Sequence, residues 1–132
     1  MTDAVREKFR PLIAILDDEE VFRTLLAYEL QERGFLAVSS ENKQEFFDSL
    51  GEINPDVIIS DVMSPVLNGL AFLKKIKASE RFRSIPVIFT TGYATAREEL
   101  YLQGAFAVMA KPYKFEDLIN CLDRALETLP TS

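Results

Sequence analysis

Residues 55–65 read PDVIISDVMSP and decide the fold. The apolar run Val57–Ile59 is short, rich in β-branched residues and followed at once by Ser60 and Asp61. Such a continuous apolar run is typical of a strand that is buried on both faces of a parallel sheet. Ligands of open parallel sheets bind beyond the carboxyl ends of the strands, so Asp61 is placed where such a sheet carries its chemistry.

The same pattern occurs along the rest of the chain, where short apolar runs alternate with amphipathic stretches. Four further runs resemble Val57–Ile59: Leu12–Leu16, Phe35–Val38, Val87–Thr90 and Phe106–Met109. Helical spacing predicts five helices, over Phe22–Leu30, Phe46–Leu50, Leu70–Ile76, Thr95–Gly104 and Phe115–Leu126. Gly34 follows the first of them as a stop signal, and Asn68-Gly69 opens the third. Thr95–Glu98 forms a capping box at the start of the fourth. Five βα units predict an α/β fold, a single doubly wound domain with a five-stranded parallel sheet and right-handed crossovers.

Composition narrows the class of protein. A chain of 132 residues with 48% hydrophobic and 27% charged residues fits one globular domain. The net charge of −6 argues against direct binding of nucleic acid or of an anionic membrane surface. Histidine is absent, which excludes a Ser-His-Asp triad and histidine-ligated metals. The single Cys121 and the absence of a long apolar run lead us to expect a cytoplasmic protein.

Polar residues end four of the five apolar runs. Asp17, Asp18 and Glu19 end the first, Ser60 and Asp61 the third, Thr90 and Thr91 the fourth, and Lys111 the fifth. Clustered carboxylates need a cation, and oxygen ligands favour Mg²⁺. Asp61 could attack phosphorus, while the Thr91 hydroxyl and the Lys111 ammonium could each hold a phosphoryl oxygen.

These stretches together resemble the receiver domain of two-component response regulators, over essentially Leu12 to Leu126. The motifs that carry the resemblance are ILDDE at residues 15–19, PDVIISDVMSP at 55–65 with Asn68-Gly69, IPVIFTTG at 85–92, and Gly104-Ala105 through Lys111-Pro112. The resemblance implies a flavodoxin-like sheet of strand order 2-1-3-4-5. We expect the chain to divide into a polar leader over 1–10, the receiver over 11–129 and a tail over 130–132.

The resemblance also implies a role for each site residue. Asp61 would be the phosphoacceptor, and Asp17, Asp18 and the backbone carbonyl of Met63 would complete the Mg²⁺ site. Thr91, rather than Thr90, would be the switch hydroxyl. Lys111 would pair with the phosphoryl group, and its bond to Pro112 is often cis in this family.

The family resemblance further implies partners. The phosphoryl donor would be a phosphohistidine on a sensor histidine kinase or a histidine phosphotransfer protein. The domain would catalyse its own phosphoryl transfer and dephosphorylation without being an enzyme that turns over a separate substrate. Phosphorylation would change a surface formed by the fourth helix, the fifth strand and the last helix; the output partner, and a homodimer through that surface, are left open.

One departure from the family and three alternatives bear on this interpretation. Val108 stands where the family usually has Tyr or Phe, and a valine is too short and stiff to swing as that aromatic does. It favours a degenerate receiver that docks partners without phosphate. A dehalogenase-type phosphohydrolase would need an acidic residue at position 63, where this chain has Met63. A flavodoxin-like electron carrier is disfavoured because the acidic residues 17–20 would repel the phosphate of its FMN cofactor.

Overall fold

The computed structural model describes residues 10–41, 43–62, 67–92 and 97–129, and five parallel strands form its single sheet. The strands are β1 (Leu12–Leu16), β2 (Leu36–Ser40), β3 (Val57–Asp61), β4 (Val87–Thr91) and β5 (Ala107–Ala110). Their order is β2-β1-β3-β4-β5, so the predicted strand order is confirmed. The chain places β2 on one side of β1 and then crosses to the other side of β1 for β3, β4 and β5, which makes the sheet doubly wound.

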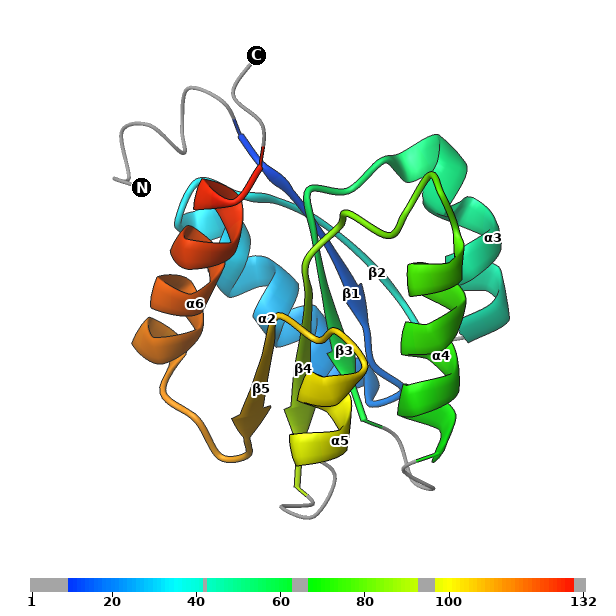
Figure 1. The fold of residues 1–132 in the computed structure, drawn as a ribbon. Helices are drawn as coiled ribbons and strands as arrows, with labels where there is room; N and C mark the ends of the chain where they lie inside the picture. The colour runs from blue at the N-terminus through cyan, green and yellow to red at the C-terminus, as the bar shows by residue number, and fades with distance from the viewer. Residues whose placement is uncertain (1–9, 42, 63–66, 93–96, 130–132) are drawn as a thin grey trace.

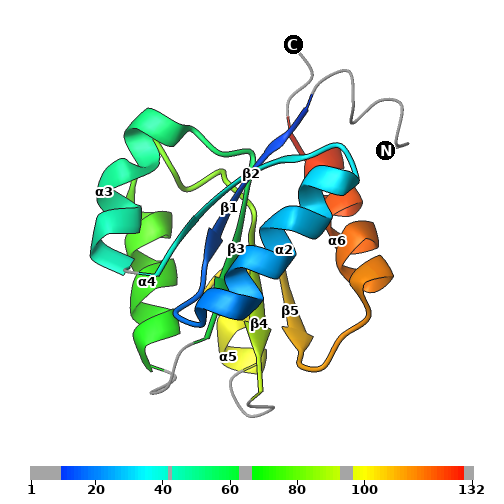
Figure 2. The ribbon, with the colours of Figure 1, turned by 180° about the vertical axis from the view of Figure 1, so that it is seen from behind.

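Five helices in the described residues connect and follow the strands. They are α2 (Glu20–Glu32), α3 (Lys43–Ile53), α4 (Leu67–Ala78), α5 (Arg97–Leu102) and α6 (Phe115–Glu127). Helices α2 and α6 lie on one face of the sheet, and α3, α4 and α5 lie on the other (Figures 1 and 2). Gly34 and Gly104 follow α2 and α5 with positive φ values of 93° and 105°, a conformation that favours glycine after a helix. Both predicted stop signals are therefore confirmed, whereas Thr95 and Ala96 of the predicted capping box lie outside the described residues.

Each face of the sheet carries its own hydrophobic core. On one face, alternate strand residues such as Ile13, Ile15 and Ile59 pack with Leu118 and Leu122 of α6. On the other face, the intervening residues pack with the helices α3, α4 and α5; they include Ala14, Leu16, Ile58, Phe89 and Val108. The lone Cys121 lies buried in the first core, as a packing residue, and burial raises the pKa of its thiol.

The expectation that every strand is buried on both faces is wrong for β2. Leu36 and Val38 expose 45% and 37% of their surface. β2 pairs only with β1 and forms an edge of the sheet in the described part of the chain. An edge strand is covered less completely than a central one, and the apolar content of a short run does not tell the two apart.

Parallel pairing brings the carboxyl ends of the strands to one edge of the sheet. The arrowheads of β3, β4 and β5 point toward this lower edge in Figure 1. The register aligns Asp61 of β3 with Thr90 of β4, and Thr91 with Ala110 of β5. The residues that follow β1, β3 and β5 therefore converge, and this edge is where the candidate site lies.

Candidate phosphoryl and metal site

Three carboxylates gather at the carboxyl edge of the sheet, as predicted. Each of Asp17, Asp18 and Asp61 offers an oxygen atom, and these oxygens lie within 4.8 Å of one another. Asp17 is buried, Asp61 is half-buried and Asp18 is exposed, so the cluster opens toward solvent on one side. An all-oxygen donor set of this size fits a hard divalent cation such as Mg²⁺.

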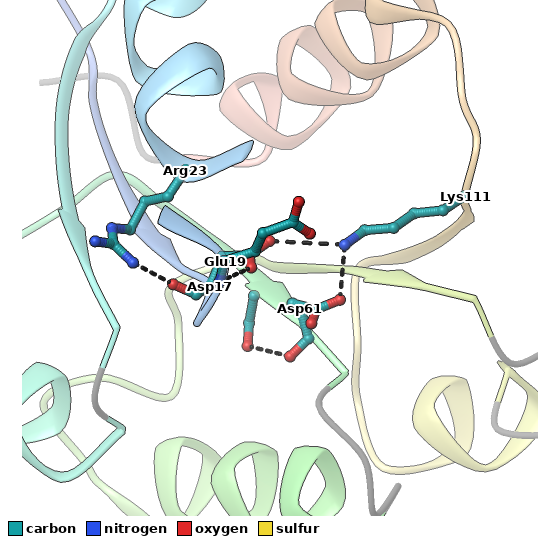
Figure 3. A network of polar contacts seen from close by, with 6 residues as sticks. Asp17, Glu19, Arg23, Asp61 and Lys111 are labelled. Atoms are coloured by element: carbon teal, nitrogen blue, oxygen red, sulfur yellow. Dashed lines mark hydrogen bonds and ion pairs between the residues drawn. The ribbon is translucent and has the colours of Figure 1, made fainter. Parts of the chain in front are cut away.

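Lys111 bridges two of these carboxylates (Figure 3). Its Nζ atom lies 3.0 Å from Oδ1 of Asp61 and 3.6 Å from Oδ2 of Asp17. The backbone N–H of Lys111 donates to the carbonyl oxygen of Thr91 at 2.8 Å, which ties the end of β5 to the end of β4. The Lys111–Pro112 peptide bond is cis, as the family resemblance implied.

Backbone contacts hold Asp17 in place. The N–H of Asp17 donates to the carbonyl oxygen of Ser40 at 3.1 Å, and its Oδ1 accepts from the N–H of Glu19 at 2.9 Å. The Arg23 guanidinium donates to the Asp17 carbonyl oxygen at 2.8 Å (Figure 3). These bonds fix the turn between β1 and α2, so that the carboxylate is positioned before any ligand arrives.

The electrostatics of Asp17 are dominated by burial. Desolvation raises the pKa of its carboxyl above the ordinary value, and the charges of Asp61 and Asp18 raise it further. The hydrogen bond from Glu19 and the charge of Lys111 act in the opposite direction. Burial still prevails, so the ionised Asp17 carboxylate is destabilised in the absence of a metal ion, and a metal ion at the cluster would relieve this cost.

Two further residues were predicted for the site, Thr91 and Met63. Thr91 is buried at the end of β4, beside Thr90, which is the residue in register with Asp61. The switch role of Thr91 stays a prediction, because it concerns a bound phosphoryl group. Met63, whose carbonyl was predicted to bind the metal, lies outside the described residues.

Sequence reasoning missed two residues that contact the site. Arg23 bonds to the Asp17 backbone, and the ring centroid of Phe22 lies 4.5 Å from Nζ of Lys111. Both belong to the first turns of α2, directly after the acidic stretch. Apolar spacing had assigned Phe22 only to the buried stripe of its helix, and nothing in that spacing indicates a contact with a lysine from the end of β5.

Val108, the departure from the family pattern, is a core residue. Val108 is 3% exposed and packs in the second core, and it belongs to β5, an edge strand of the sheet in the described residues. This N–H donates to the hydroxyl of Tyr101 on α5 at 3.0 Å. An aromatic side chain is thus present beside Val108, but it comes from the neighbouring helix.

Replacement of Tyr101 by phenylalanine is expected to lower the free energy of unfolding by about 1 kcal/mol, because the Val108 N–H loses its acceptor. Urea unfolding measures this difference. The control is Tyr28→Phe, since Tyr28 is highly exposed. Equal changes in the two variants would mean that water replaces the Tyr101 hydroxyl at no cost.

No helix within the described part of the chain is both long and apolar enough to cross a membrane. This finding concerns residues 10–41, 43–62, 67–92 and 97–129 alone.

Comparison with known proteins agrees with the fold. The profile of the family described as response regulator receiver domain matches residues 13–123. The DNA-binding transcriptional regulator NtrC of Escherichia coli strain K12 is 33% identical over 119 residues, which cover 89% of this chain and 25% of NtrC. The chain therefore spans about a quarter of the length of that relative.

Solved structures give the same result. The chemotaxis response regulator CheY4 of Vibrio cholerae has a TM-score of 0.78 and 26% identity, covering 88% of this chain and 98% of that one. The response regulator TrrA of Thermotoga maritima, solved in complex with Mg²⁺ and BeF, has a TM-score of 0.77 and 28% identity, covering 88% and 99%. With the family profile matched over most of the chain and its strand order and acidic cluster in place, this chain belongs to the response regulator receiver domain family.

Proposed function

We propose that this receiver accepts a phosphoryl group on Asp61 in a Mg²⁺-dependent reaction. The observation that carries the proposal is the Lys111 ammonium, which bridges Asp61 and Asp17 within a cluster of three carboxylates. A cation and a lysine beside a half-buried carboxylate are what an incoming phosphoryl group requires, because phosphoryl transfer depends on positioning and charge neutralisation.

Asp61, Lys111 and Thr91 each have a separate role in the proposed phosphoryl transfer. An Asp61 carboxylate oxygen forms the new bond to phosphorus, while the bond from phosphorus to the donor nitrogen of a phosphohistidine breaks and its electron pair leaves with the imidazole. The Lys111 ammonium and the Thr91 hydroxyl donate hydrogen bonds to phosphoryl oxygens. Water later attacks phosphorus and releases inorganic phosphate, which restores the carboxylate.

Asp17, Asp18 and Asp61 would hold Mg²⁺, together with the carbonyl of Met63. When bound, the ion supplies neutralisation of the charge on the phosphoryl oxygens. The support for this assignment is the oxygen donor set and the unfavourable burial of Asp17. Further support comes from TrrA, which was solved in complex with Mg²⁺ and BeF and is 28% identical to this chain.

The donor we propose is a sensor histidine kinase or a histidine phosphotransfer protein. The chain has no histidine of its own, so the phosphohistidine must come from a partner. The output surface we propose is formed by α5, β5 and α6, where Tyr101, Val108 and Arg124 line a groove of about 300 Å³. A homodimer through that surface stays open.

Incubation with acetyl phosphate tests the proposal. Intact-mass spectrometry should show one phosphoryl adduct in Mg²⁺ and none in chelator. Binding of beryllofluoride in the presence of Mg²⁺ provides a second readout that does not depend on phosphate lifetime. If neither the adduct nor beryllofluoride binding is found, the receiver acts as a docking module that works without phosphate, the alternative that Val108 favours.

A further inference from the structure

The aromatic ring of Phe22 lies against the lysine of the candidate site. Nζ of Lys111 is 4.5 Å from the centroid of this ring, within the range of about 6 Å over which a cation is attracted to an aromatic face. The same Nζ atom contacts Asp61 at 3.0 Å and Asp17 at 3.6 Å. The ammonium is therefore held by two carboxylates and by one ring.

We propose that Phe22 is a positioning residue for phosphoryl transfer: its ring keeps the Lys111 ammonium at the carboxylate cluster while the ammonium exchanges a carboxylate partner for a phosphoryl oxygen. The consequence for the reaction rests on the proposed function, whereas the contact itself can be tested separately. Phe22 touches no reacting atom and acts only through Lys111.

Neighbouring residues fix the ring in this position. Phe22 packs against Tyr113, with ring centroids 6.3 Å apart and an angle of 49° between the planes. Both rings line a groove of about 200 Å³ on α2 and the start of α6, and both pack against the first core. Arg23, the next residue, anchors this turn of α2 to the Asp17 carbonyl oxygen. The ring is thus preorganised by the core and does not depend on the ligand.

The surroundings of the ring are partly shielded from water. Tyr113 is half-buried, and desolvation, followed by the charges of Asp17, Glu29 and Asp61, raises the pKa of its hydroxyl. Attraction between a cation and a ring is stronger where water is partly excluded. Lys111 itself is 28% exposed, so its ammonium lies at the boundary between this apolar wall and the open side of the cluster.

A ring suits this task better than a third carboxylate would. Lysine has a long flexible stem and would otherwise sample many rotamers, which slows any step that needs the ammonium in one place. A carboxylate would hold it, but would also compete with the phosphoryl oxygens for its hydrogen bonds. The ring attracts the charge without accepting a strong hydrogen bond, so the ring need not be displaced when the phosphoryl group arrives.

A fluorinated series at position 22 separates this role from simple packing. Phenylalanine carrying one, two or three fluorine atoms changes little in shape, but each fluorine weakens the negative face of the ring. We expect the rate of phosphorylation by acetyl phosphate to fall stepwise, by about three- to tenfold at three fluorines. Beryllofluoride affinity should fall in the same order, and Phe22→Tyr, which keeps an aromatic face, should retain most of the rate that Phe22→Leu loses.

Two controls decide what the trend means. The same series at Phe46, which stacks on Phe72 in the second core, should leave the rate unchanged. In a Lys111→Ala background the series at Phe22 should have no further effect on beryllofluoride affinity, because the cation is gone. A flat series at Phe22, or an equal trend without Lys111, would overturn the proposal in favour of a packing role.

Nuclear magnetic resonance tests the contact even if the receiver accepts no phosphoryl group. Protons on the ε-carbon of Lys111 should show an upfield ring-current shift, and this shift should disappear in Phe22→Leu. A failed phosphorylation assay with the ring-current shift present would refute the proposed function alone. Absence of the shift in the wild-type chain would refute the positioning of Lys111 by Phe22.

Discussion

Replacement of Asp61 by asparagine is expected to abolish the phosphoryl adduct that acetyl phosphate and Mg²⁺ form on the wild-type chain. The amide has nearly the same shape as the carboxylate, but it lacks the anionic oxygen that attacks phosphorus. It also removes the charge that Lys111 contacts at 3.0 Å and one of the three oxygen donors of the acidic cluster. Intact-mass spectrometry of the two proteins, side by side, measures the loss.

Asp56 provides a matched control for this experiment. It lies one residue before β3, at the opposite edge of the sheet, where its Oδ2 accepts a hydrogen bond from the N–H of Leu12 at 2.8 Å. Asparagine can still accept that bond through its amide oxygen, so Asp56→Asn should keep the adduct. An adduct on Asp61→Asn with unchanged Mg²⁺ dependence would mean that a neighbouring carboxylate is the acceptor, and peptide mapping would identify it.

The sequence was sufficient to predict the strands and the edge of the sheet that carries the chemistry. β1 was predicted with its observed bounds. β3 extends two polar residues beyond its predicted apolar run, and β4 extends one. The extension reaches Asp61 and Thr91, because main-chain pairing in a parallel sheet continues beyond the last apolar side chain. The strand order itself came from the family resemblance, since apolar periodicity carries no information about which strands are neighbours.

The contacts within the site were only partly predictable. Asp17, Asp18, Asp61 and Lys111 follow or end strands, so topology alone brings them together, and the structure shows them in contact or within ligand distance. Phe22 and Tyr101 act at positions that local spacing assigns to helix faces. Phe22 reaches Lys111 from a distant βα unit, and Tyr101 reaches Val108 across the turn after α5, so both contacts depend on how a helix packs on the sheet.

The edge strand β2 illustrates the same limit for the fold. Leu36 and Val38 resemble core residues in sequence, yet both are exposed because no strand or helix covers that edge completely within the described residues. A pattern of apolar residues predicts that a strand forms, whereas its burial depends on its place in the sheet.

Replacement of Asp17 by asparagine is expected to raise the free energy of unfolding by about 1 to 3 kcal/mol at pH 7 in chelator, because it removes a buried charge at a site of mutual repulsion. The amide oxygen can still accept the hydrogen bond from the N–H of Glu19. Lys111 keeps its contact with Asp61. Urea unfolding provides the measurement. Asp18→Asn is the control, because Asp18 is exposed and loss of its charge relieves only the repulsion between carboxylates.

The pH dependence of this gain has a definite sign. The pKa of Asp17 is raised in the folded protein above the ordinary value of 3.8, so the folded state binds the proton more tightly than the unfolded state. Protonated Asp17 therefore favours folding at low pH, and this contribution is lost as the pH rises above 3.8 through the raised value. Asp17→Asn lacks this loss, so its advantage over the wild-type chain should be small in acid and largest at neutral pH.

Mg²⁺ should act against the stability gain of Asp17→Asn. A cation that binds the folded state alone stabilises it by mass action, so Mg²⁺ should raise the unfolding midpoint of the wild-type chain much more than that of Asp17→Asn. The variant would thus be more stable without the metal and less able to bind it, as expected when a site trades stability for a function. An Asp17→Asn chain that is less stable than the wild type at pH 7 in chelator would contradict this account. It would show that the contact of Asp17 with Lys111 outweighs the cost of burying the carboxylate, and that the cluster is stable without a metal ion.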